Sequence, residues 1–143
     1  MLRHVFIGMT LCLGVTVCVA QGAKGSSTGN FQGKWVVEDV LGYAGTSGGT
    51  PVAKRLLGET LTISPNAIDF DGDHCQPSKG FVVHAVDTAS RLKADYDAYL
   101  NDFKLPSKAT LLDSDNCATV FRADDYSVIF GWNGVMVRAY RDK

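Results

Sequence analysis

The segment 118–140, ATVFRADDYSVIFGWNGVMVRAY, decides the fold of this chain. It contains three runs rich in β-branched and aromatic residues, the residue types that favour strands. The runs are 118–123, 126–131 and 135–140. The turn between the last two runs contains Asn133-Gly134, and Asn-Gly is the strongest short-range signal for a β-hairpin. Strands joined by short polar turns predict an antiparallel meander.

Strand signals continue through the earlier part of the chain. The segment 59–64, for example, alternates threonine with leucine and isoleucine, as a half-buried strand does. Further strands are expected at 33–40, 59–64, 67–70, 81–86 and 109–112. The total is about eight mostly antiparallel strands, which we expect to form a closed or nearly closed barrel.

Two helices are expected among these strands. The segment 50–57 has Thr at its start, Pro in its first turn and Gly directly after its end, which predicts a short helix. A longer helix is predicted to begin at Asp87 or Thr88 and to end at Leu105-Pro106, because its apolar residues share one helical stripe. The stripe consists of Ala89, Leu92, Tyr96, Tyr99, Leu100 and Phe103. The predicted fold class is mainly β with one sizeable helix, α+β.

The N-terminus predicts export. Arg3 precedes an uncharged apolar run over 5–19, and the small residue Ala20 follows, which is the pattern of a secretory signal peptide. The apolar run is too short for a membrane-spanning helix, so we expect no transmembrane anchor. Cys18 leaves a lipid anchor open as an alternative. The expected organisation is a signal peptide at 1–20, a flexible lead-in at 21–30 and a single β-rich domain at 31–143, in a periplasmic or secreted protein.

Removal of the leader leaves two of the four cysteines, Cys75 and Cys117. Two cysteines in an oxidising compartment predict a structural disulfide. Closing a loop of about 43 residues stabilises a fold by about 4 kcal/mol in the chain-entropy model. Free thiols or metal ligation are the alternative, which no Cys-x-x-Cys pattern supports.

Each of these cysteines follows a cluster of aspartates. A disulfide would therefore bring five carboxylates into one neighbourhood, which we take as the candidate binding site. They are Asp69, Asp71, Asp73, Asp113 and Asp115. Calcium is one alternative, because the first three alternate along the chain as Ca²⁺ ligands do. The EF-hand spacing then fails at Gly72 and Gly80, so no metal is assigned. Ordinary solvated turn residues are the other alternative.

Charge and motifs exclude several function classes. The segment after residue 20 holds 13 basic and 15 acidic residues, a net charge of −2, with no basic stripe for nucleic acid. Only His74 and His84 remain there, and no motif of a hydrolase or of a phosphate-binding loop is present. We therefore expect no enzyme and no cofactor, with a hydrolase that uses paired carboxylates as the alternative.

The sequence Phe31-Gln32-Gly33-Lys34-Trp35 resembles the Gly-x-Trp opening of lipocalins and related calycin barrels. The resemblance implies a small lipocalin-like barrel, with Arg138 on the last strand packing over Trp35 to close its base. The chain departs from that family by placing its main helix in the middle of the sequence. Eight bulky residues are expected to fill the interior. They are Trp35, Leu61, Ile63, Phe70, Phe81, Phe121, Ile129 and Phe130.

Two functional hypotheses follow. The first is an exported module that binds a protein partner through disulfide-linked acidic loops. By analogy of size, compartment and charge, it resembles bacterial lysozyme inhibitors and immunity proteins, whose targets are often cationic cell-wall hydrolases. The alternative, implied by the lipocalin resemblance, is a carrier of a small apolar ligand inside the barrel. The sequence predicts no oligomeric state.

Overall fold

The computed structural model describes residues 28–143. The predicted signal peptide, 1–20, and most of the predicted lead-in lie outside the described residues. The last residues of that lead-in form a 3-10 helix, η1 (Thr28–Asn30), so regular structure begins before residue 31. Among residues 28–143, no helix is long and apolar enough to cross a membrane.

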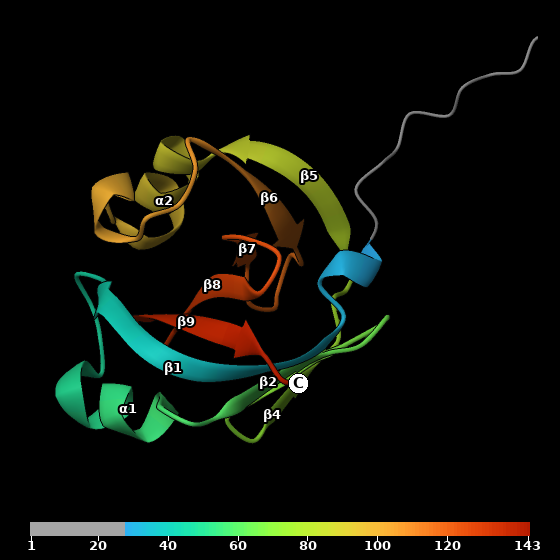
Figure 1. Ribbon diagram of the computed structural model, residues 1–143, viewed down its shortest axis with the longest axis horizontal. Coiled ribbons are helices and arrows are strands. Elements are labelled where there is room, and N and C mark those ends of the chain that lie inside the picture. Colours follow the sequence, from blue (N-terminus) through green and yellow to red (C-terminus); the bar gives the residue numbers. More distant parts are fainter. Residues whose placement is uncertain (1–27) are drawn as a thin grey trace, which may run out of the picture.

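The described chain forms one sheet of nine antiparallel strands (Figure 1). The strands are β1 (Gly33–Tyr43), β2 (Thr60–Ile63), β3 (Ile68–Phe70), β4 (Asp73–Cys75), β5 (Val82–Asp87), β6 (Lys108–Asp113), β7 (Val120–Arg122), β8 (Ser127–Trp132) and β9 (Val135–Arg141). The eight expected strands are all present, and β4 is an additional one.

The order of strands in the sheet is β4-β3-β2-β1-β9-β8-β7-β6-β5. Strands that follow one another along the chain pair, except β4 and β5, and β1 also pairs with β9, as in an up-and-down barrel. The pair β4–β5 is missing, so the sheet is curled but open. The expected mainly β class with helices is confirmed, but the closed or nearly closed barrel is not formed, because β4 has only three residues and the next segment turns toward the β6–β7 loop. There the backbone N–H of Ser78 donates to Asn116 Oδ1 at 2.9 Å.

Strands β6 to β9 are buried on both faces, because their side chains alternate between two clusters. The inner cluster spans the curl: Phe70 on β3 meets Phe130 and Trp132 on β8 edge to face, with ring centroids 5.0 and 5.2 Å apart. The outer cluster includes Phe121 and Ile129, which were expected in the interior. Both residues lie instead on the outer face, because they occupy the alternate positions of their strands, whose side chains point away from the inner cluster.

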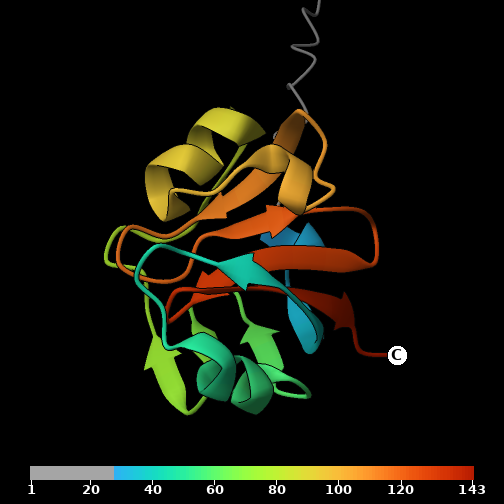
Figure 2. The same cartoon turned by 90° about the vertical axis from the view of Figure 1, so that its left-hand side faces the viewer.

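The outer cluster is covered by the second helix. The helix α1 (Gly49–Leu56) matches the short helix that was expected, whereas α2 (Thr88–Tyr96) is shorter than expected. Asp87 caps α2 by accepting from Ser90 N–H at 2.9 Å. Asp97 ends it in the left-handed conformation, with φ 53°, and the stripe continues in a separate 3-10 helix, η2 (Leu100–Asp102). Figure 2 shows α2 and α1 at opposite ends of the sheet.

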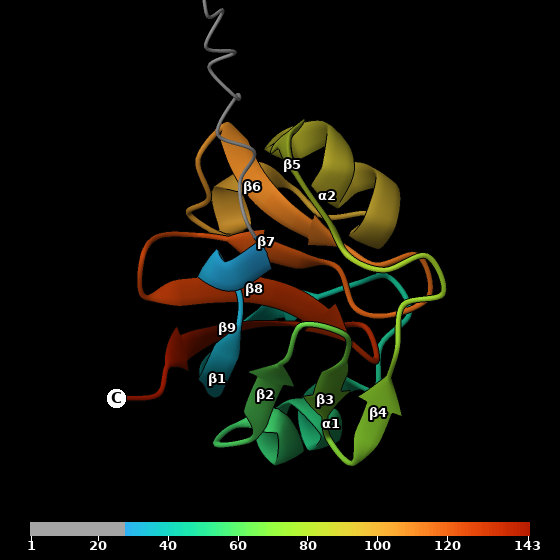
Figure 3. The same ribbon diagram turned by 90° about the vertical axis from the view of Figure 1, so that its right-hand side faces the viewer.

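The Gly-x-Trp resemblance implied that Arg138 packs over Trp35, but another arginine of β9 occupies that position. The guanidinium of Arg141 lies 4.1 Å from the Trp35 ring centroid, because Trp35 and Arg141 are paired residues of β1 and β9. Arg138 points to the opposite face, where its Nη2 donates to Phe103 O at 2.7 Å. Trp35 Nε1 donates to Phe31 O, in the residue after η1, at 2.8 Å. Figure 3 shows η1 leading directly into β1.

Candidate binding cleft

The predicted disulfide between Cys75 and Cys117 is confirmed. Cys75 ends β4, at one edge of the sheet, and Cys117 lies in the loop between β6 and β7, with 5.8 Å between the two Cα atoms. Asn116 reinforces the bridge, because its Nδ2 donates to Gln76 O at 3.2 Å. The disulfide and these hydrogen bonds hold the segment after β4 against the β6–β7 loop, across the gap left by the missing strand pair.

Beside this brace lies a polar cleft of about 560 Å³. Four elements contribute to it: the start of β4, helix α2, the β6–β7 loop and the tip of the β8–β9 hairpin. The lining residues are Asp73, Arg91, Asp95, Tyr96, Asp113, Asp115, Cys117, Ala118, Thr119, Gly131, Trp132 and Asn133. The cleft therefore contains four carboxylates and one guanidinium, and its net charge is negative.

One wall of the cleft is an ion-pair network. Arg91 Nε lies 2.5 Å from Asp95 and its Nη1 lies 3.0 Å from Asp113, while His84 Nε2 lies 3.4 Å from the same Asp113 oxygen. Hydrogen bonding to Asp95 and then to Asp113 raises the pKa of Arg91. Partial burial acts to raise the pKa of Asp113, but Arg91, Ser114 N–H and His84 outweigh it and hold that pKa below its usual value.

The aromatic part of this wall is Tyr96. A Cβ added at Gly131 would lie 2.3 Å from the Tyr96 ring, so a glycine is required for the ring to pack there. Burial raises the pKa of Tyr96 to about 12, so the phenol remains neutral at ordinary pH. Tyr96 is therefore a fixed part of the cleft and not a titrating group.

Two carboxylates remain open toward the cleft. Asp115 accepts from Ser78 Oγ at 3.3 Å and lies 3.5 Å from the exposed Lys79 ammonium. Asp73 has no hydrogen-bond or ion-pair partner for its carboxylate among residues 28–143. Trp132 forms the neighbouring apolar wall. A cation that enters the cleft would therefore meet Asp73 without a counter-ion, and it would compete at Asp115 with the exposed Lys79 ammonium.

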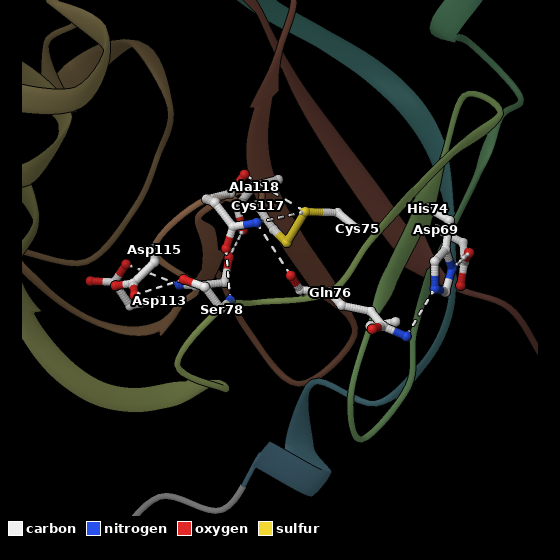
Figure 4. The surroundings of a disulfide bond; sticks show 12 residues. Asp69, His74, Cys75, Gln76, Ser78, Asp113, Asp115, Cys117 and Ala118 are labelled. Atoms are coloured by element: carbon white, nitrogen blue, oxygen red, sulfur yellow. Dashed lines mark hydrogen bonds and ion pairs between the residues drawn. A yellow bond between two sulfur atoms is a disulfide. The ribbon is translucent and has the colours of Figure 1, made fainter.

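Asp69 and Asp71 lie apart from this group. Figure 4 shows Asp69 and His74 on one side of the disulfide, with Asp113 and Asp115 on the other. Asp69 pairs with His74 at 2.5 Å. Asp71 pairs with Arg55, accepts from Trp132 Nε1 at 3.1 Å and is only 13% exposed. Three of the five predicted acids therefore line the cleft, and the other two are held in separate ion pairs.

Sequence reasoning missed Arg91, Asp95, Tyr96 and Trp132 as members of the site. Arg91 and Asp95 stand four residues apart, a spacing that pairs charges on a helix, but nothing in the sequence points them at Asp113. Among residues 28–143, no group of three or more His, Cys, Asp and Glu side chains is arranged to hold a metal ion.

Comparison of the chain with protein-family models, with curated proteins and with solved structures gives no match. Fold and site alone therefore define the class: an open, curled antiparallel sheet with an acidic cleft that a disulfide braces at its rim.

Proposed function

We propose that this protein is an exported, non-enzymatic binding module that captures a protein partner in the braced cleft. The partner would present a lysine or arginine side chain, and a cationic cell-wall hydrolase fits this description. The protein would then act as an inhibitor or an immunity protein in the periplasm or outside the cell.

The observation that carries the proposal is the cleft itself. Asp73 lines it from the start of β4 and Asp115 lines it from the β6–β7 loop, two segments that the Cys75–Cys117 disulfide joins, and Trp132 lines it beside them. A basic side chain entering between them would form an ion pair with either acid and stack on the indole face. Because the disulfide already holds together the two backbone segments that carry these acids, binding would require little further ordering of the backbone.

The interior of the curl favours this function over the lipocalin-like carrier. Phe70, Phe130 and Trp132 meet across it, and the core residues around them are buried. A carrier needs an apolar space of several hundred cubic ångströms at this place. Here aromatic side chains occupy that part of the interior.

The test is capture by the immobilised protein, with lysozyme and a peptidoglycan amidase as probes, followed by assays of their inhibition. The double variant Asp73→Asn and Asp115→Asn should weaken capture by about tenfold at low salt, and by less at high salt, where the charges are screened. Its melting temperature should barely change, because neither carboxylate makes a buried contact.

Asp125→Asn is the matched control, because Asp125 is exposed in the turn between β7 and β8, outside the cleft. The proposal requires that this variant capture the probe as the wild type does. If Asp125→Asn weakens capture as much as the double variant does, the effect is one of general charge. If the double variant captures the probe as the wild type does, the proposed site is contradicted.

A further inference from the structure

The two edges of the sheet differ in what protects them. The edge at β4 is three residues long and is tied at its end by the disulfide. The edge at β5 is six residues long and pairs on one side only, with β6, in an unbroken register (Figure 1). Among residues 28–143, no backbone hydrogen bond reaches the other side of β5.

The sequence of β5, Val82-Val-His-Ala-Val-Asp87, has none of the usual features that block an edge. It contains no lysine, no proline and no bulge, which are the devices that natural sheets use against edge-to-edge pairing. Its one carboxylate, that of Asp87, stands at the end of the strand. Val82 is 55% exposed, which is unusual for a large aliphatic residue on a strand.

We propose that β5 pairs with β5 of a second copy of this chain, antiparallel and across a two-fold axis, so that two curled sheets become continuous. The sequence of the edge argues for a copy as the partner. In the register that places His84 opposite His84 of the second copy, Val82 of each copy lies opposite Val86 of the other. Val83 then lies opposite Ala85, and no carboxylate lies opposite another carboxylate. This pairing covers the exposed Val82 with an apolar neighbour and satisfies the free backbone groups.

The contact is small, because one strand and its flanking side chains lie below the size of a standard interface. The dimer should therefore depend on concentration, and sedimentation velocity from about 10 µM to about 1 mM should show monomer passing into dimer. Val82→Lys should shift the midpoint of the monomer–dimer transition to at least tenfold higher protein concentration, because an edge lysine opposes such pairing. Leu57→Lys is the matched control, since Leu57 is 46% exposed in the loop after α1, and it should leave the midpoint unchanged.

The register has its own test. His84→Cys places two thiols opposite each other at the two-fold axis, so oxidation should join two chains covalently, whereas Ala85→Cys places them two positions apart and should cross-link much more slowly. A protein that stays monomeric throughout the concentration range would overturn the proposal. So would a dimer that Val82→Lys leaves intact, because that dimer uses another surface. Neither result bears on capture in the cleft, which is assigned to Asp73 and Asp115 and not to Val82.

Discussion

Removal of the disulfide is the perturbation whose magnitude follows most directly from the structure. The variant Cys75→Ala with Cys117→Ala opens a loop whose ends are 42 residues apart in sequence. In the chain-entropy model this lowers the free energy of unfolding by about 4 kcal/mol, because the unfolded chain regains the freedom that the cross-link removed. For a domain of this size the expected fall in melting temperature is about 15 °C.

The assay is urea denaturation of the variant, of the oxidised wild type and of the wild type held reduced. The m-value should rise in the two forms without the bridge, because their unfolded ensembles are more expanded. Native-state hydrogen exchange should also become faster in β4, which pairs only with β3 through three residues. If the melting temperature decreases by less than about 4 °C and the m-value does not change, the view that the bridge constrains the whole unfolded chain is refuted.

Three further predictions concern the base of the sheet and the cleft wall. Arg141→Met should lower the free energy of unfolding by about 2–3 kcal/mol and alter Trp35 fluorescence, because it removes the guanidinium stacked on Trp35 and its hydrogen bonds to Gln32 O and Asn30 O. A variant as stable as the wild type would contradict that role. Asp113→Asn should lower stability at pH 7 but approach the wild type as pH falls below about 4 in a series of thermal melts. The pKa of Asp113 in the folded protein is below the unfolded value of 3.8, so the stability that the carboxylate contributes is present above that value and is lost as the carboxylate protonates. A stability difference between wild type and variant that stays constant with pH would exclude the ion pair as the cause. Gly131→Ala should cost about 1–3 kcal/mol in denaturant titrations, because its Cβ would displace the Tyr96 ring, and an unperturbed variant would contradict that packing.

Local patterns in the sequence predicted the strands well, because alternation and hairpin turns are encoded by neighbouring residues. β4 escaped prediction because Asp73-His74-Cys75 contains no β-branched or aromatic strand former. The early end of α2 also escaped, because the apolar stripe continues in phase beyond Asp97, and only the left-handed backbone there interrupts it.

Pairing between distant residues could not be predicted from the sequence. Arg138 and Arg141 lie on the same strand, and choosing between them as the cover of Trp35 requires the register of β1 with β9. That register contains irregularities between Val37 and Asp39 and between Val40 and Gly42. The correct residue therefore depends on the position of bulges that no local pattern reveals.

The candidate site was predicted in part for the same reason. The disulfide followed from the leader and the cysteine count, and it brought Asp73, Asp113 and Asp115 to one cleft as expected. The cations that neutralise the other acids come from helices far away in sequence, such as Arg55 on α1 for Asp71. A group of acids read from sequence thus overestimates the free negative charge, because its counter-ions are set by tertiary structure.

The central claim, that the braced cleft is the place of binding, is tested most directly by hydrogen–deuterium exchange of the protein with and without a captured hydrolase. The account predicts slower exchange in the complex at 73–79, 113–119 and 131–133, with little change at the turn that carries Asp125. Protection confined to that turn, or to the base around Trp35, with none at these three segments, would contradict it.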